Sequence, residues 1–392
     1  MTVGCFGRAL GALLCLLALT GTRPAGAGEA RLDALAGSPI VEDDGDIFDY
    51  PGLVTRYGDA AFLTVQPSPA SGNAGVLVGR ETAFGFWVHR TPRFDDLTEA
   101  DALFGGFDLS EVHPLFDLLF GTDAGFGLRL SLSAGLDVAD VYSGVEDDLL
   151  STGDTSVGID LQAGYSFDLG GAHPYHGDFG VGLTLSYFEV VELGQTTYLT
   201  GWIPSFLVRH RSVFDPAADV SWVLDVMLTR RAYTVEAEGA TSVDGSFGRW
   251  MTYAAAGPRV RLPADVTLWL AGRVSLEQLG GEIDDDAQTS LLGVGFPGLV
   301  ASIEVLLWEL LTVRAGIDYD VYITQSESPG DDPRLAEHGL GHRFAWSTGL
   351  GLSLGRFQID GTVSQRFYFN GPQVLGGNDP GFLGLISAAY AW

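Results

Sequence analysis

The feature that most constrains the fold is a strict alternation of apolar and polar residues over long segments. Residues 126–138, 156–168, 313–324 and 357–369 each place apolar side chains at one parity and mostly polar ones at the other. Successive side chains of a β-strand point to opposite faces, so each segment is predicted to be a strand with one apolar and one polar wall. The runs last about 11–15 residues, whereas strands of soluble proteins last about 5–6 and tilted membrane strands about 9–11. The pattern therefore predicts strands that cross a membrane.

The same reading along the whole chain predicts a closed barrel. The expected strands are 74–79, 83–91, 125–138, 153–168, 176–190, 197–211, 218–231, 250–262, 264–276, 289–307, 311–325, 342–354, 356–369 and 382–392. A further apolar piece from Ala60 to Val65 makes sixteen possible. Short links such as 262–264 alternate with longer polar ones such as 232–249, as in outer-membrane barrels with short periplasmic turns and long outer loops. The predicted fold is an all-β, transmembrane, antiparallel up-and-down barrel of about 14 strands (14–16), with short N-terminal and periplasmic-side helical or plug segments.

The N-terminus predicts export. Arg8 precedes an apolar run, and Ala25 and Ala27 fit the small residues before a cleavage site, so residues 1–27 are expected to be a cleaved signal peptide. Both cysteines lie within it. Residues 28–59 are expected to be an acidic leader or plug, and residues 60–392 the barrel. No later stretch is apolar for long enough to form a transmembrane helix.

Composition excludes several kinds of function. The formal net charge of −29 makes the chain a poor nucleic-acid binder, because phosphate contacts need basic patches. No cofactor is expected. No serine has a histidine and an acid that spacing alone would bring together, so an enzyme is not expected. Acidic loop clusters at 146–148, 284–286 and 331–332 are interpreted as solvated tips, with divalent-ion bridging to lipopolysaccharide as the alternative.

The last strand carries the sharpest single signal. Apolar residues stand at every second position up to Tyr390 and the C-terminal Trp392. This pattern resembles the signal that bacterial outer-membrane proteins present to their barrel-assembly machinery. The expected surroundings are therefore an outer membrane, with its lipid and lipopolysaccharide. The aromatic residues expected on the outer face are Trp202, Trp222, Tyr253, Tyr319 and Tyr390.

Three segments depart from regular alternation. Pro297 and Gly298 should kink or bulge the strand 289–307, since proline cannot donate to the strand ladder. Residues 28–59 contain clustered carboxylates, for which a calcium loop is the alternative to a solvated leader or an inward plug. Residues 92–123 are expected to be an inserted, partly helical segment on the periplasmic side, with one acidic helix and an apolar one at 113–120.

A family resemblance rests on the N-terminal segment and the strand number. Ile47-Phe48-Asp49-Tyr50-Pro51 gives Ile-Phe-x-x-Pro after the signal peptide, and about fourteen strands follow. These features resemble the FadL/PorV-type barrels, which include transporters of hydrophobic compounds and a secretion-system accessory barrel. Where that family often carries Asn-Pro-Ala, this chain has Tyr50-Pro51-Gly52. The resemblance implies a plug or gate that contains Phe48, Tyr50 and Pro51.

The polar walls of the strands supply the candidate lumen. Its expected charged residues are Arg129, Asp160, Asp225, Arg231, Arg273, Arg314, Asp318, Asp320, Asp360 and Arg366. They would line an open pore, or form ion pairs that brace a closed one, and bracing is favoured because buried charges need partners. The leading hypothesis is a passive channel or transporter for small or hydrophobic solutes. The alternative is a non-transport barrel that serves as a partner platform for secretion or envelope organisation, for which a fully plugged lumen with an apolar periplasmic patch at 115–120 would be evidence.

Overall fold

The computed structural model describes most of the chain after the expected signal peptide. The described residues are 28–67, 70–90, 114–142, 149–192, 195–200, 205–238, 243–283, 287–308, 310–327, 337–363 and 383–392. The expected signal peptide, the acidic helix of 92–123, Trp202 and the three acidic loop clusters lie outside these residues. Within the described part no helix is long and apolar enough to cross a membrane.

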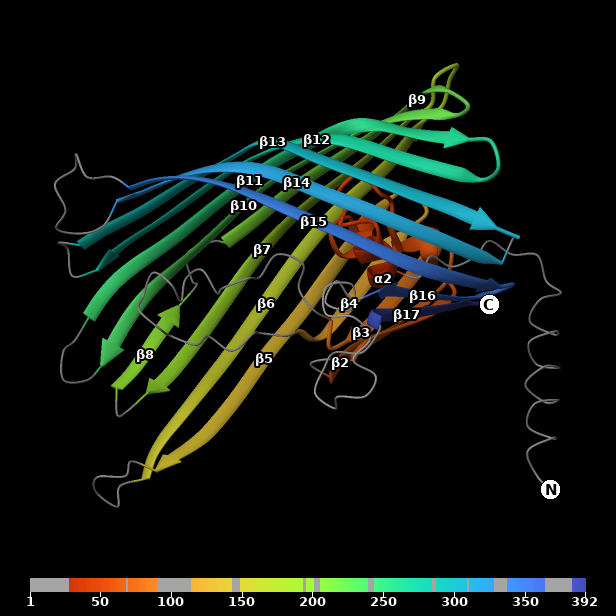
Figure 1. Ribbon diagram of the computed structural model, residues 1–392. Coiled ribbons are helices and arrows are strands. Elements are labelled where there is room, and N and C mark those ends of the chain that lie inside the picture. The colour runs from red at the N-terminus through yellow and green to blue at the C-terminus, as the bar shows by residue number, and fades with distance from the viewer. Residues whose placement is uncertain are drawn as a thin grey trace, which may run out of the picture.

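Strands make up nearly all of the described structure (Figure 1). Their bounds are β1 Ala60–Pro67, β2 Ala70–Val78, β3 Thr82–Val88, β4 Pro114–Thr122, β5 Phe126–Tyr142, β6 Leu149–Leu169, β7 Tyr175–Glu192, β8 Gln195–Thr200, β9 Ser205–Ala217, β10 Val220–Glu238, β11 Val243–Leu262, β12 Val266–Ile283, β13 Ala287–Leu307, β14 Leu311–Glu327, β15 Glu337–Leu354, β16 Phe357–Val363 and β17 Leu383–Ala391.

These strands form one closed antiparallel sheet. Each strand pairs with its neighbours in the chain, and β1 also pairs with β17, which closes the barrel. The short β8 and the longer β9 both pair with β7 and β10, so together they fill one place in the wall. The described strands thus occupy sixteen places. The predicted fold class is confirmed, and the two places beyond fourteen belong to β1 and β4.

The two faces of the wall differ as the alternation predicts. On β3 the exposed residues Phe84 and Phe86 alternate with the buried Ala83, Gly85 and Trp87. A closed barrel satisfies every backbone hydrogen bond between its strands, so its apolar outer face can lie in lipid. Exposed rings at Trp222 and Tyr319 continue this face, as predicted.

One predicted helix is wrong. Residues 113–120 were expected to form an apolar helix, but Pro114–Thr122 is strand β4, paired with β3 and β5. Leu118 faces outward, whereas Leu119 faces inward and is buried. A strand whose two faces both contact apolar surroundings loses its alternation, and a short apolar run then cannot be told from a buried helix.

The missed strands also reverse the side of the inserted segment. Trp392 N donates a hydrogen bond to Asp59 O at 3.0 Å, so β1 begins where β17 ends. The short turns β2–β3, β4–β5, β6–β7 and β9–β10 lie at this same end of the barrel. Because β1 is a strand, β3 ends and β4 begins at the opposite end, among the long loops. The predicted periplasmic position of residues 92–123 is therefore wrong for the described ends, Arg90 and Pro114.

The strand β13 is irregular at its proline. The pairing register of β13 with β14 shifts between Gly295 and Gly298, on either side of Pro297. Proline has no N–H to donate to the neighbouring strand, so the regular ladder is interrupted there.

Candidate functional site

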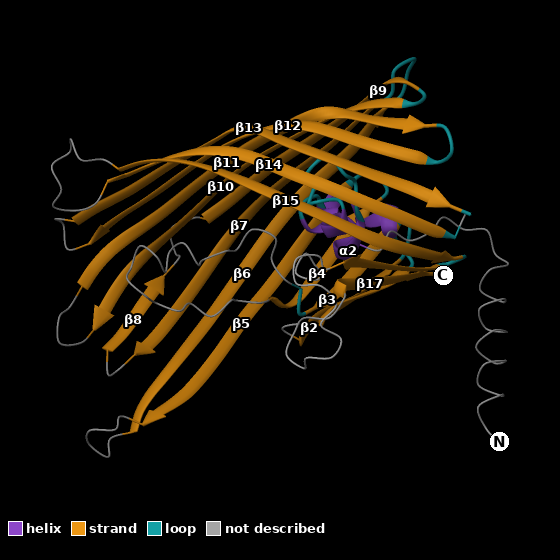
Figure 2. Ribbon diagram, viewed as in Figure 1, coloured by secondary structure: helices purple, strands orange, loops and turns teal. Residues whose placement is uncertain are grey.

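Residues 28–57 lie inside the barrel, toward the end that carries the short turns (Figure 2). We call them the inner segment. They form the α-helix α2 Gly28–Ala34 and the 3-10 helices η1 Asp44–Phe48 and η2 Pro51–Tyr57. Every residue from 43 to 54 is buried. The inner segment is therefore packed into the barrel along most of its length.

Two of the clustered carboxylates, those of Asp43 and Asp46, cap the start of η1. The Asp43 N–H donates to Asp46 Oδ2 at 2.9 Å, and the Gly45 N–H donates to Asp43 Oδ1 at 3.3 Å. This reciprocal capping satisfies backbone donors that the first turn of a helix leaves without partners. Pro51 then begins η2, where its missing N–H costs nothing. Local chemistry thus gives the segment its shape.

A row of glycines on the wall lets the inner segment approach closely. One glycine stands on each of four adjacent strands, β4 to β7, in register with the next: Gly121, Gly127, Gly164 and Gly180. A Cβ at Gly127 would lie 2.0 Å from Pro51 O, and one at Gly180 would lie 2.1 Å from Asp49 O. Any larger residue would occupy the space of the segment's backbone. The row is therefore a seat shaped for Asp49 to Gly52.

Arg209 joins this part of the segment to the wall. Its guanidinium pairs with Asp49 of the inner segment and with Asp225 of β10, where Nη2 lies 2.6 Å from Oδ2. The Tyr50 hydroxyl donates to Asp225 Oδ1 at 3.0 Å, and the Tyr253 hydroxyl donates to Oδ2 at 2.9 Å. Burial raises the pKa of Tyr50, so its hydroxyl stays a donor.

Tyr253 was expected on the outer face, and this prediction is wrong. Its hydroxyl contacts Asp225 within the barrel. Next to Tyr253 both faces of β11 carry neutral residues, but further along the strand Arg249 and Arg259 share the side of Tyr253 and form ion pairs. The charged residues of β11 were therefore an available signal for its inward face, on which the phenol has its hydrogen-bond partner.

Arg211 forms a second link of the same kind. It is 1% exposed, and its Nη1 lies 2.5 Å from Asp46 Oδ2 of the inner segment. Its Nε and Nη2 donate to Asp178 Oδ2 of β7 at 2.9 and 2.8 Å. Removing one partner from a buried ion pair costs about 3–5 kcal/mol. Each of the two arginines thus bridges one carboxylate of the segment and one of the wall.

Arg129 and Gln162 hold the segment through its backbone. Arg129 Nη1 donates to Phe48 O at 2.8 Å, and Gln162 Nε2 donates to Asp49 O at 2.9 Å. Arg129 Nε also donates to Asp117 Oδ1 at 3.0 Å. The wall therefore satisfies two consecutive carbonyls where η1 ends.

Helix α2 is held by a separate set of charges. Arg31 Nε lies 3.0 Å from Glu304 Oε2 of β13, which in turn lies 2.6 Å from Arg314 Nε of β14. Arg314 also pairs with Asp360 of β16. The Ala30 N–H donates to Ser387 Oγ of β17 at 3.1 Å. Both ends of the inner segment are therefore anchored to the wall.

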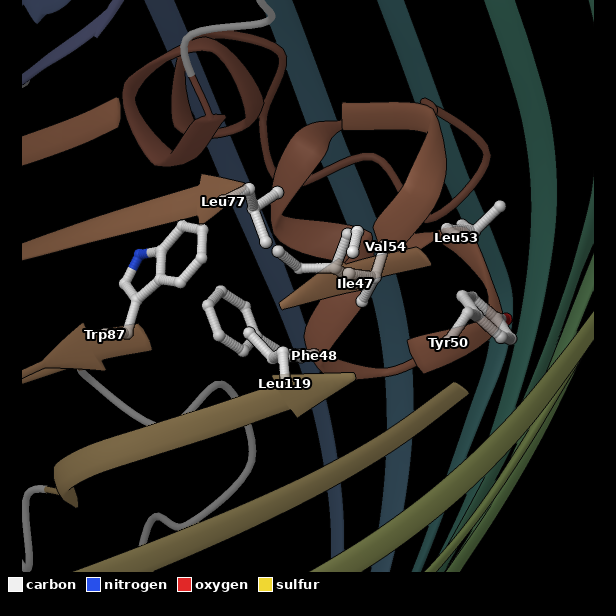
Figure 3. Close-up of a cluster of buried hydrophobic side chains, with 9 residues drawn as sticks. Ile47, Phe48, Tyr50, Leu53, Val54, Leu77, Trp87 and Leu119 are labelled. Carbon is white, nitrogen blue, oxygen red and sulfur yellow. The ribbon is translucent and has the colours of Figure 1, made fainter. Parts of the chain in front are cut away.

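An apolar cluster completes the contact of the inner segment with the wall (Figure 3). Phe48 packs edge-on against Trp87 of β3, with ring centroids 5.2 Å apart. Leu77 of β2 and Leu119 of β4 contact the same group as Val54 of η2. Fully burying a side chain of this size contributes about 1.5–3 kcal/mol. The segment is thus held by apolar contacts as well as by charges.

A further group of charges faces the lumen on β12, β14 and β15. Arg273 Nη2 lies 2.9 Å from Asp318 Oδ1 and also pairs with Asp320. Arg343 Nη2 lies 3.0 Å from Asp320 Oδ2, and its side chain is 63% exposed. Arg343 is thus accessible to water, whereas Asp318 and Asp320 are buried.

Most of the predicted lumen residues lie on the inner face. The buried ones form the pairs given above, and Asp160 lies 3.6 Å from Arg129. Arg231 is half-buried on β10, and Arg366 lies outside the described residues. The structure brings Arg129 and Asp225 to the inner segment, together with the predicted Phe48, Tyr50 and Pro51. Tyr390 and Trp392 stack 6.4 Å apart at the end of β17, and their role as an assembly signal stays a prediction.

Sequence reasoning missed the residues that hold the segment most firmly. These are Asp46, Asp49, Asp117, Asp178, Arg209 and Arg211. The spacing of Arg209 and Arg211 places both on one face of a predicted strand, which was an available signal. Their partners are separated from them by as many as 165 residues, so spacing could not identify the pairs.

The arrangement defines a transmembrane β-barrel of the outer-membrane type that holds its own N-terminal segment. No protein-family model matches the chain, and no curated protein does. Among solved structures it is similar to the Pseudomonas putida toluene transporter TodX, at 10% identity and a TM-score of 0.40, over 94% of this chain and 99% of that one. It is also similar to a Pseudomonas aeruginosa FadL homologue, at 13% identity and a TM-score of 0.39, over 95% of this chain and 100% of that one. The translocator domain of the Neisseria meningitidis autotransporter NalP is similar at 10% identity and a TM-score of 0.32, over 68% of this chain and 88% of that one.

Proposed function

We propose that the protein is a passive outer-membrane channel for small polar solutes, and that the inner segment is its gate. The observation that carries this proposal is the double pairing of Arg209 and Arg211. Each guanidinium pairs with one carboxylate of the segment, Asp49 or Asp46, and with one of the wall.

This pairing makes release of the segment physically feasible. When the segment leaves, Arg209 keeps Asp225 as a partner and Arg211 keeps Asp178. Arg129 likewise keeps Asp117. None of these three arginines is then stranded as an uncompensated buried charge, which is the costly outcome for a buried ion pair. The carboxylates of the segment pass into water, where charged groups are well solvated.

The choice of polar solutes rests on the inner face beyond the segment. Arg249 and Glu277 pair there at 2.5 Å, beside the group formed by Arg273, Asp318 and Asp320. Water solvates such groups, whereas an apolar solute would displace that water and gain no hydrogen bond. Charged side chains that line a pore influence its selectivity.

The experiment is single-channel conductance of the purified protein in planar bilayers, beside a variant that lacks residues 28–57. We expect rare or small steps from the full chain and frequent, larger steps from the variant. Heat-dependent gel mobility must show that the variant barrel is folded. Silence from a folded, inserted variant would contradict the channel.

The apolar periplasmic patch that would favour a partner platform is not found at 115–120. These residues belong to β4, which divides them between its two faces. Leu118 is exposed on the outer wall, and Leu119 is buried against the inner segment.

A further inference from the structure

A polar cluster lies on the outer face of the wall, on the strands β7 and β9. His210 Nε2 lies 2.7 Å from Ser212 Oγ, and the Tyr175 hydroxyl lies 2.8 Å from the same oxygen. The buried Arg209 and Arg211 point inward, so their neighbours His210 and Ser212 point outward. This position is unusual, since the outer face of such a barrel is otherwise apolar.

The partner of the second ring nitrogen fixes the tautomer of His210. Nδ1 lies 2.9 Å from the backbone carbonyl oxygen of Asp178. A carbonyl only accepts hydrogen bonds, so Nδ1 carries the proton and donates. Nε2 then holds the lone pair and accepts from the hydroxyl of Ser212. A serine hydrogen-bonded to an oriented, neutral imidazole is the arrangement that activates a nucleophile.

The cluster is surrounded by exposed apolar side chains. In the strand pairing Ser212 stands opposite Leu224, and the next outward residues are Phe214 and Trp222. Leu224, Phe214 and Trp222 are 40%, 40% and 52% exposed. Acyl chains would cover such a surface in a membrane.

Aromatic residues beside the cluster are of the kind that gather at the polar boundary of the bilayer. Ser212 lies in the short-turn half of β9, which stops at Ala217. Tyrosine and tryptophan collect at membrane interfaces, and Tyr175 and Trp222 accompany the serine. The ester linkages of lipids lie at the same boundary.

We propose that Ser212 and His210 form a catalytic dyad that hydrolyses carboxylic ester bonds of membrane lipids. Ser212 Oγ bonds to the ester carbonyl carbon while its proton passes to His210 Nε2. The bond between that carbon and the alcohol oxygen then breaks, and the alcohol leaves with the proton. Water repeats the steps on the acyl-serine and releases a fatty acid, so one ester and one water give one acid and one alcohol.

Tyr175 has a supporting role in this reaction. Its hydroxyl can turn from Ser212 Oγ toward the carbonyl oxygen, on which negative charge develops during attack. Loss of one such donor typically lowers the rate about 10²–10³-fold. The activity is separate from the channel, because the dyad is on the opposite face of the wall from the inner segment.

The test uses the full-length protein in mixed micelles with dioleoylphosphatidylcholine, and a fluorophosphonate probe. We expect release of oleate and covalent labelling of Ser212, located by mass spectrometry. Ser212→Ala should abolish both. His210→Asn should lower the rate by about 10²–10⁴-fold, the usual contribution of a general base. Tyr175→Phe should keep the labelling site and lower the rate of oleate release.

One control variant separates chemistry from structure. Ser275→Ala removes a serine on β12 and should release oleate at the rate of the unaltered protein. Oleate release that is equal in the unaltered protein and Ser212→Ala, or labelling elsewhere only, would overturn the proposal. Channel conductance should be the same with and without Ser212→Ala, so each proposal can fail alone.

Discussion

Replacement of Gly127 by alanine should loosen the inner segment by a predictable amount. A Cβ at this position would lie 2.0 Å from Pro51 O and 2.6 Å from Gly52 N. Ordinary contact begins near 3.4 Å, so the backbone of the segment must retreat by about 1.4 Å. The hydrogen bonds to Phe48 O and Asp49 O, now 2.8 and 2.9 Å long, would then exceed the limit for such bonds.

The size of the effect follows from those two bonds. A hydrogen bond from a charged donor contributes about 1.5–3 kcal/mol, and a neutral one about 1. Together the loss is about 2.5–4 kcal/mol, or roughly 60- to 700-fold in the equilibrium for release of the segment.

Hydrogen exchange of the amides in residues 44–57 measures this equilibrium directly. Tyr50 N–H and Leu53 N–H are bonded within the segment at 2.7 and 2.9 Å, and they exchange when it opens. The matched control is Gly158→Ala, an inward position of β6 where a Cβ makes an ordinary contact at 3.5 Å. Equal rates of amide exchange in residues 44–57 of Gly127→Ala and Gly158→Ala would refute the role of the glycine row in seating the inner segment.

Three further changes test other contacts. Arg211→Met should destabilise the seated segment by about 3–5 kcal/mol. Asp46→Asn should destabilise it by less, because Arg211 then keeps its partner on the wall. Hydrogen exchange of residues 44–57 compares the two variants. Ala264→Gly should stabilise the barrel by about 1 kcal/mol, because Ala264 has a φ of +65°; urea unfolding in micelles measures this. Burial and nearby carboxylates raise the pKa of Tyr57 well above its usual value, so stability from its protonated hydroxyl is complete below about pH 10 and declines as the pH rises further. Protection of the segment, which is the exchange rate of a free amide at the same pH divided by that of the segment, should therefore fall above about pH 10, and Tyr57→Phe should flatten that fall.

The barrel could be predicted from sequence because its pattern is local. Each strand shows its two faces within about a dozen residues, and this repeat defines the wall. The prediction failed where the inner face is not polar. On β4 the inward Leu119 packs against the segment, and on β11 the inward Tyr253 is neutral.

The position of the inner segment was only partly predictable, for a different reason. Phe48, Tyr50 and Pro51 were identified through a family resemblance, and the structure places them against the wall. The position of the acidic residues of the inner segment could be found only when their partners were known, because Asp46 and Arg211 come together only in the folded barrel. The dyad of His210 and Ser212 depends on Asp178 of another strand to set its tautomer, which spacing does not reveal.

The most direct test of the gate is a reversible lock between the segment and the wall. A Cβ at Gly121 would lie 2.9 Å from Val54 Cβ, so a shift of about 0.6 Å gives the separation of a disulfide. In the double variant Val54→Cys and Gly121→Cys, single-channel conductance would be recorded before and after reduction in the same bilayer. We predict that the oxidised protein stays closed and that reductant restores openings. Equal opening in both states, with the disulfide confirmed, would contradict the inner segment as the gate.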